Sequence, residues 1–151
     1  MAYEKTLSIY TDGAARGNPG EAGAGIIVRD GHTIILEKAQ YLGHTTNNIA
    51  EYCAFILGLK EAEHLGASDI TLYTDSQLLE KQIKGEYRVK DEKLKPLHGK
   101  AKEYLQKFMR YKLCHIRRNE NMDADRLANQ AIDRRSPDNA DTTIEVLLAS
   151  L

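Results

Sequence analysis

Two segments far apart in this chain end in the same three residues and show the alternation of β-strands. Residues 7–12 read Leu-Ser-Ile-Tyr-Thr-Asp, and residues 70–75 read Ile-Thr-Leu-Tyr-Thr-Asp. Because strand side chains alternate between faces, Asp12 shares a face with Tyr10, and Asp75 shares a face with Tyr73. If the two strands are adjacent and parallel, both carboxylates emerge at the carboxyl edge of one sheet, where open α/β sheets bind ligands. The alternative is that each aspartate merely ends its strand or caps the next element.

The order of the remaining elements predicts an α/β fold. Asp30-Gly31 is typical of a hairpin turn between two strands, and Gly66 is typical of a helix end. Predicted strands span residues 7–11, 24–29, 33–42, 70–74 and 111–116, and predicted helices span residues 47–65, 76–83, 94–109 and 122–132. The order β-β-β-α-β-α-α-β-α predicts a mixed sheet with helices packed on it. We expect one domain over residues 1–135 and a C-terminal tail over residues 136–151.

The composition is that of an ordinary globular protein, with 42% hydrophobic and 28% charged residues. Cys53 and Cys114 lack metal-ligand spacing and are predicted to be small core residues in a reducing compartment. The first ten residues do not have the pattern of a signal peptide, and no segment approaches the ~20 apolar residues of a membrane span. We therefore expect a cytoplasmic, monomeric protein without a membrane partner.

The charge is distributed unevenly along the chain. The net charge of −1 does not by itself indicate a protein that binds polyanions. A run of basic residues could nevertheless hold a phosphate backbone, although such runs are more often solvated. The run consists of Lys81, Lys84, Arg88, Lys90, Lys93 and Lys95, with Lys100, Lys102 and Lys107 beyond it.

Two further acids lie where an apolar surface is expected. Glu51 falls one turn into its predicted helix, and Asp125 borders the apolar stripe of the last helix, between Ala124 and Leu127. Acids also favour the first turn of a helix for electrostatic reasons alone, and Asp123 is assigned no role on that ground. Grouping four acids is unfavourable without cations, because two like charges about 4 Å apart at an effective dielectric near 20 repel by roughly 4 kcal/mol.

An all-oxygen cluster of this kind predicts a metal site that performs phosphoryl chemistry. Carboxylates suit Mg²⁺ or Mn²⁺ better than zinc. Two such ions can activate a water molecule and stabilise the leaving oxygen of a phosphodiester. No Ser-His-Asp or Cys-His arrangement competes, and the chain has no Walker-type glycine-lysine loop.

Four motifs resemble those of type 1 ribonuclease H, in the family's order, from about residue 6 to residue 133. One such motif would be weak, whereas four together are highly specific. They are Tyr10-Thr11-Asp12-Gly13-Ala14 with Gly17-Asn18-Pro19-Gly20, then Thr45-Thr46-Asn47-Asn48-Ile49-Ala50-Glu51, then Tyr73-Thr74-Asp75-Ser76-Gln77, and finally Asn121-Met122-Asp123-Ala124-Asp125-Arg126-Leu127-Ala128-Asn129.

The resemblance implies the ribonuclease H fold: a five-stranded mixed sheet of order 3-2-1-4-5, with strands 1 and 4 parallel and helices on both faces. It implies an endonuclease that cuts the RNA strand of RNA–DNA hybrids with two Mg²⁺ ions, or Mn²⁺ as a substitute, leaving 5′-phosphate and 3′-hydroxyl ends. The ions would be held by Asp12, Glu51, Asp75 and Asp125. The substrate would be contacted by Asn18, Asn47, Asn48 and Gln77 in the minor groove and by Thr46 near a phosphate of the DNA strand. Turn and cap chemistry is the alternative for these polar residues.

The chain departs from the family in three places, one of which is that the tail after Ile132 has no counterpart in the family's pattern. Many relatives have a Gly-His-rich loop before the last acid, whereas residues 114–121 are shorter here. We expect His115 to lie in the strand as a core or edge residue, and Arg117 or Arg118 to reach the scissile phosphate, with Arg118 the preferred catalytic residue. The chain also has no tryptophan and lacks the basic protrusion of some relatives, so the lysine run would hold substrate more weakly.

Three alternatives stay open. The same chemistry could extend to double-stranded RNA, because the histidine loop is altered. The domain could be a catalytically silent nucleic-acid-binding module, although all four acids are present. An ATP-binding phosphotransferase with a similar sheet is disfavoured, because 151 residues do not accommodate a second nucleotide-binding domain.

Overall fold

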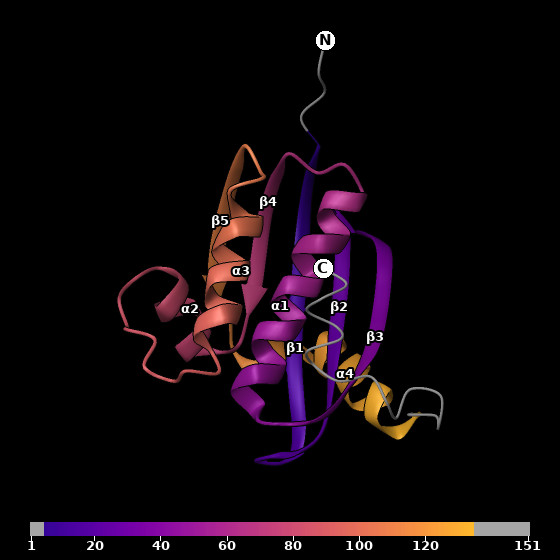
Figure 1. Ribbon diagram of the computed structural model, residues 1–151. Coiled ribbons are helices and arrows are strands. Elements are labelled where there is room, and N and C mark those ends of the chain that lie inside the picture. The colour runs from indigo at the N-terminus through magenta and orange to yellow at the C-terminus, as the bar shows by residue number, and fades with distance from the viewer. Residues whose placement is uncertain (1–4, 135–151) are drawn as a thin grey trace.

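A computed structural model describes residues 5–134 of the chain as three layers, with a sheet between two layers of helices (Figure 1). The predicted order of helices and strands is confirmed, with one 3₁₀ turn added before the last helix. The elements are β1 (Thr6–Gly17), β2 (Gly20–Asp30), β3 (Thr33–Thr45), α1 (Asn47–His64), β4 (Asp69–Thr74), α2 (Gln77–Ile83), α3 (Lys95–Leu105), β5 (Arg110–His115), the 3₁₀ turn (Arg118–Glu120) and α4 (Met122–Asp133). The predicted tail, residues 136–151, lies outside the described residues.

The five strands lie in the order β3-β2-β1-β4-β5, which confirms the expected sheet. β1, β2 and β3 are antiparallel neighbours, whereas β4 is parallel to both β1 and β5. The register pairs Tyr10 with Tyr73 and Thr11 with Thr74. The two strands with the same ending are therefore adjacent, and Asp12 and Asp75 follow at the same edge.

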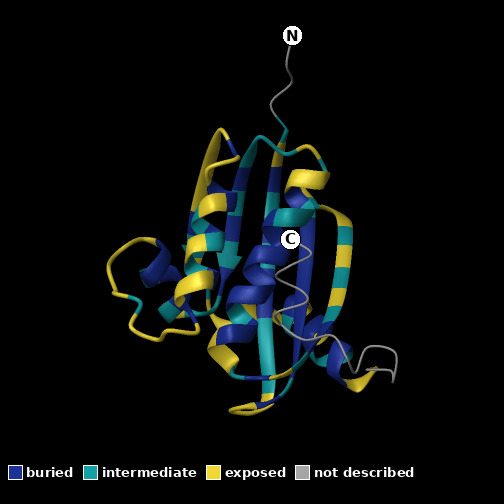
Figure 2. Cartoon of the chain, viewed as in Figure 1, coloured by how far each residue is buried: buried dark blue, intermediate teal, exposed yellow. Residues whose placement is uncertain are grey.

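The main core lies between the sheet and α1. This helix is buried along most of its length, as its dark blue colour in Figure 2 shows. Its side chains Tyr52 and Phe55 pack in the same cluster as Leu7, Ile9 and Leu72 of β1 and β4. Cys53 is buried as predicted, but Cys114 is only half-buried, because it lies on the face of the sheet away from α1; both cysteines are free.

The other face is covered by α4, which lies against β2. Ala124 and Leu127 of α4 pack on Ile27, with Tyr10 beside them. A Cβ atom at Gly25 would overlap the backbone oxygen of Ala124, so the helix approaches the strand as closely as the backbone allows. β2 begins at Gly20, before the predicted start at residue 24, because residues 20–25 have little strand propensity of their own but pair with both β1 and β3.

No helix in the part of the chain that the structure describes is long and apolar enough to cross a membrane.

Candidate active site

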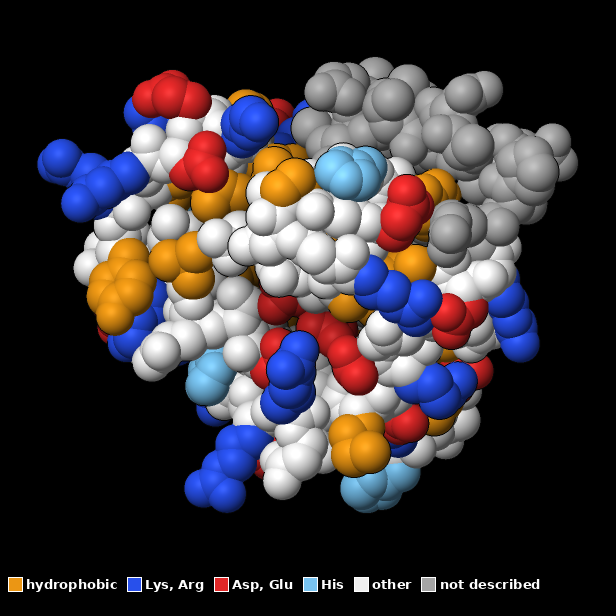
Figure 3. Space-filling model, turned by 90° about the horizontal axis from the view of Figure 1, so that it is seen from below, with side chains coloured by type: hydrophobic (Ala, Val, Ile, Leu, Met, Phe, Trp, Pro, Cys, Tyr) orange, Lys and Arg blue, Asp and Glu red, His pale blue; other side chains and the backbone are white. Residues whose placement is uncertain are grey.

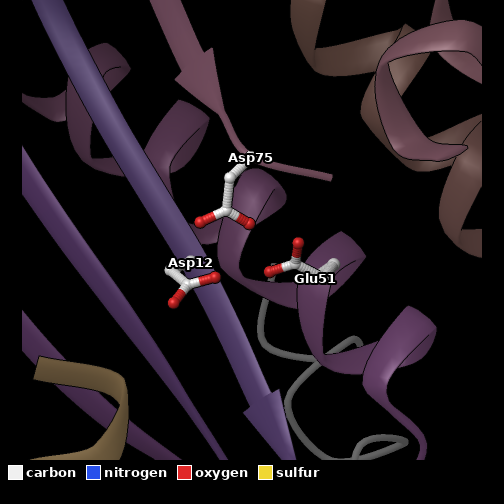
Figure 4. Close-up of side chains that lie close together, drawn as sticks. All are labelled: Asp12, Glu51 and Asp75. Carbon is white, nitrogen blue, oxygen red and sulfur yellow. The ribbon is translucent and has the colours of Figure 1, made fainter. Parts of the chain in front are cut away.

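The carboxylates of Asp12, Glu51 and Asp75 converge at the carboxyl edge of the sheet (Figure 4). One oxygen from each lies within 4.8 Å of the others. Asp12 is 4% exposed, and the other two side chains are half-buried. Seen from this end, acidic side chains gather in the middle of the surface with a basic side chain beside them (Figure 3).

Backbone geometry brings the three acids together. β4 ends at Thr74, opposite Thr11, so the next residue of each strand is an aspartate. The first turn of α1 lies directly against β1, because Gly13 has no side chain; a Cβ there would overlap the Ala50 carbonyl. This contact allows the Gly13 amide to donate a short hydrogen bond to the Glu51 carboxylate.

Asp125 approaches Asp12 from α4, on the other face of the sheet. Its carboxyl is among the neighbours that raise the pKa of Asp12. It does not belong to the group of three whose oxygens all lie within 4.8 Å. Asn129, one turn further along α4, donates from Nδ2 to the Asp125 backbone oxygen at 3.0 Å and to Oδ1 at 3.4 Å. The structure therefore brings three of the four predicted acids together and sets the fourth beside Asp12.

The electrostatics of the cluster favour a bound cation. Burial, followed by the charges of Glu51 and Asp75, raises the pKa of Asp12 to about 11. Burial raises the pKa of Glu51 to about 7, opposed by hydrogen bonds from Asp12 and the Gly13 amide and by the charge of Arg118. Carboxylates that hold protons at neutral pH release them when a divalent ion binds. This all-oxygen donor set fits Mg²⁺ or Mn²⁺.

Arg118 and His115 lie at the rim of the cluster. Arg118 is exposed in the 3₁₀ turn, and its charge lowers the pKa of Glu51. His115 is the last residue of β5, as predicted, and its exposed ring places Nε2 3.3 Å from the Asp75 backbone oxygen. His115 is thus an edge residue rather than a core residue. The Arg117 amide donates to Glu120 Oε1 at 3.0 Å, which fixes the turn that carries Arg118.

Three of the predicted substrate-contacting residues make hydrogen bonds within the protein. Asn18 Oδ1 accepts from the Asn47 amide at 3.1 Å, and Asn47 Oδ1 accepts from the Ala15 amide at 3.0 Å. Thr46 caps α1 through Oγ1, which accepts from the Ile49 amide at 3.3 Å. The cap interpretation thus holds for Thr46 Oγ1, whereas the side-chain oxygens of Asn18 and Asn47 make hydrogen bonds that join β1 and the turn after it to the start of α1. Asn48 and Gln77 are exposed in the first turns of α1 and α2.

Sequence reasoning assigned no role to Asn121, although it was part of the fourth motif. Its side chain is 2% exposed and contacts the cluster: Nδ2 donates to Asp75 Oδ2 at 3.2 Å. An asparagine directly before an acidic helix start is typical of a cap. Its side chain makes no capping bond here.

The chain matches a known protein family and known relatives. The family model described as reverse transcriptase-like matches residues 10–131. Ribonuclease HI of Halobacterium salinarum is 42% identical over 125 residues, which are 82% of this chain and 63% of that protein. A bifunctional protein of Mycobacterium tuberculosis is 41% identical over 127 residues, 83% of this chain and 35% of that protein. The chain therefore spans less than two thirds of the length of these relatives.

Solved structures show the same architecture. RNase H1 of Halobacterium salinarum superposes with a TM-score of 0.84 at 40% identity, covering 86% of this chain and 99% of that one. LC11-RNase H1, crystallised in complex with an RNA/DNA hybrid, superposes with a TM-score of 0.81 at 37% identity, covering 85% of this chain and 97% of that one.

Proposed function

Because the chain belongs to the type 1 ribonuclease H family, we propose that it is an endonuclease that hydrolyses the RNA strand of RNA–DNA hybrids. The observation that carries the proposal is the convergence of Asp12, Glu51 and Asp75 at the sheet edge. It is supported by the similarity to LC11-RNase H1, whose crystal structure contains an RNA/DNA hybrid. The expected products have 5′-phosphate and 3′-hydroxyl ends.

Asp12, Glu51, Asp75 and Asp125 would hold two Mg²⁺ ions, with Mn²⁺ as a substitute. When bound, the ions would supply activation of the attacking water and stabilisation of the 3′-oxygen leaving group. The protein would supply fixed ligands. The Gly13 amide orients the Glu51 carboxylate, and the Asp12 carboxyl is buried on a strand that continues past it. Fixed charges that need no reorganisation stabilise a transition state most effectively.

Arg118 would bind the substrate rather than stabilise the fold. Its side chain is exposed, yet its charge reaches Glu51. A scissile phosphate next to the acids would therefore lie within range of the guanidinium, which binds phosphate oxygens in a fork-like geometry. The ring of His115 lies against the Asp75 backbone, so His115 is less suited than Arg118 to bind the scissile phosphate.

The hydrogen bonds that Asn18 and Asn47 make within the protein indicate how these residues would contact a hybrid. The side-chain oxygens of Asn18 and Asn47 accept hydrogen bonds from backbone amides of the protein. Their Nδ2 groups are therefore the atoms suited to contact substrate. These groups would donate to base acceptors and ribose oxygens in the minor groove, where RNA displays its 2′-hydroxyls. Asn48 and Gln77 would extend this contact. Thr46 Oγ1 accepts from Ile49, so its hydroxyl hydrogen can donate to a phosphate of the DNA strand.

The deciding experiment is cleavage of end-labelled RNA–DNA hybrid, double-stranded RNA and double-stranded DNA, each with Mg²⁺, Mn²⁺ or EDTA. We expect metal-dependent cutting of the RNA strand of the hybrid alone. Cutting of double-stranded RNA as well would support the broader substrate class. A folded, metal-binding protein that cuts no duplex would overturn the proposal in favour of a silent binding module. Monomeric state and cytoplasmic location stay predictions.

A further inference from the structure

Asn121 has a buried side-chain amide that does not cap the helix it precedes. It directly precedes α4, yet its side chain makes no capping bond. It points instead to the carboxyl edge of the sheet, where Nδ2 donates to the Thr11 backbone oxygen at 2.9 Å and to Asp75 Oδ2 at 3.2 Å. One amide group thus joins β1 to a carboxylate of the acidic cluster.

The two acceptors determine the orientation of the amide. The Thr11 carbonyl lies where β4 ends, since Thr74 is the last residue paired with β1. A rotated amide would direct Oδ1 at two oxygen acceptors and lose both hydrogen bonds. The NH₂ group therefore faces Thr11 and Asp75, and Oδ1 faces elsewhere.

Asn121 Oδ1 is buried and has no hydrogen-bond partner among residues 5–134. It is the one buried side-chain oxygen or nitrogen in that part of the chain of which this is true. Asn129, which contacts Asp125 in a similar way, differs: its Oδ1 lies 3.4 Å from Arg16 Nη2. An unpaired buried acceptor is unfavourable, and residues 5–134 provide no donor for Oδ1.

Solvent does not supply the missing donor. Oδ1 is fully buried, so water in the adjoining hollow on the α4 side of the sheet, whose wall includes Asn121, Tyr10 and Arg29, does not reach it. The amide is therefore held by the two hydrogen bonds of its NH₂ group, and an unpaired buried acceptor of this kind is typical of functional sites.

We propose that Asn121 is a positioning residue for the metal site: its Nδ2 holds Asp75 Oδ2, so that the other oxygen of Asp75 is directed to the cation. This inference rests on the proposed metal-dependent function and adds a residue outside the set of carboxylates. Groups that orient metal ligands in this way set metal affinity, and their removal weakens it about 10–100-fold.

The test is the affinity of the full chain for Mg²⁺ and Mn²⁺ without substrate, measured by calorimetry after removal of metal. Asn121→Ala and Asn121→Leu should each weaken binding by about 10–100-fold. The leucine variant fills a similar volume, so it measures the loss of hydrogen bonds without a cavity. Asn119→Ala, in the exposed 3₁₀ turn nearby, is the matched control and should keep wild-type affinity.

A second readout separates positioning from a structural role. With hybrid as substrate, the variants should need more Mg²⁺ for half-maximal rate while the KM for hybrid stays unchanged. Variants that bind metal like wild type and only unfold at lower temperature would overturn the proposal, since Asn121 would then merely extend the ladder at Thr11. A wild-type protein that binds metal but cuts nothing would contradict the nuclease alone, whereas one that binds no metal would overturn both.

Discussion

The carboxyl edge of the sheet and the basic segment after α2 are both charged, but they are built differently. The acids are attached to buried strands and to a helix pressed against the backbone of β1. The basic segment, residues 84–95, is exposed except at Val89 and Leu94, and its Lys95 pairs locally with the exposed Glu92. Exposed pairs of this kind contribute little energy. Changes at the sheet edge should therefore have large effects, and changes in the basic segment should have small, salt-dependent ones.

Asp75→Asn should have the largest effect. Loss of one carboxylate charge removes a metal ligand, and we expect hybrid cleavage to fall by more than about 100-fold. The metal-free variant should be as stable as wild type or more so, because a repelling charge is gone from beside Asp12. Single-turnover cleavage and thermal unfolding in EDTA measure the two effects. Cleavage at the wild-type rate would contradict the site assignment.

Gly13→Ala should damage the site through the backbone. The new Cβ would overlap the Ala50 carbonyl, so α1 must shift and the Gly13–Glu51 hydrogen bond must weaken. We expect a loss of about 1–3 kcal/mol in the free energy of unfolding, as for other overpacked positions, together with a clear loss of cleavage. Urea unfolding measures the first effect.

The control for this variant is Gly99→Ala in α3, where a Cβ would meet nothing within 4 Å. Alanine in a helix interior stabilises by about 0.5–1 kcal/mol relative to glycine. If both substitutions had the same effect, the close approach of α1 to β1 would not be what holds the site.

The metal-free protein should lose stability as pH rises. The pKa of Glu51 is raised from 4.5 to about 7, so between these values the unfolded chain releases a proton that the folded protein retains. The slope is at most about 1.4 kcal/mol per pH unit for each group. Glu51 makes its full contribution below pH 4.5 and loses it through pH 7, while Asp12 continues the decline toward about 11.

Thermal unfolding in EDTA from pH 4.5 to 9 measures this decline. Glu51→Gln should flatten the part below pH 7, and Mg²⁺ should raise the unfolding temperature most at high pH. A metal-free protein that becomes more stable over this range would show that burial and the neighbouring charges do not raise the pKa values of Asp12 and Glu51.

Removal of basic side chains should have the smallest effect. Arg88, Lys90 and Lys93 are exposed, and their joint replacement by alanine should reduce the salt-dependence slope of hybrid binding by up to about 3. We expect KM to rise a few-fold at moderate salt, with kcat unchanged. Lys112→Ala, on the exposed edge strand β5, is the control. A large fall in kcat would mean that this segment takes part in catalysis.

The parts of the fold that local pattern determines could be predicted from the sequence. The alternation in residues 7–12 and 70–75 placed two strands, and their matching endings indicated the parallel pair that brings Asp12 and Asp75 together. Glu51 required a tertiary contact, which the glycine at position 13 permits. The first half of β2 could not be predicted, because residues 20–25 are held by pairing with β1 and β3 rather than by their own propensity.

Asn121 shows a second limit of sequence reasoning. Its sequence context is that of a helix cap, and nothing local distinguishes a capping asparagine from one that bonds to another strand. The distinction depends on where β4 ends relative to β1, which is a property of the assembled sheet. The C-terminal tail and the domain boundary at residue 135 stay predictions.

β1 continues from Asp12 to Gly17 and remains paired with β2 along this whole stretch. Asp12, which we propose as the central ligand, thus belongs to the middle of a strand and not to a loop. The order of this part of the site is established when the chain folds, so no loop entropy is lost there when a substrate arrives. Binding free energy at Asp12 is then available for selecting the shape of the duplex instead of for organising the protein.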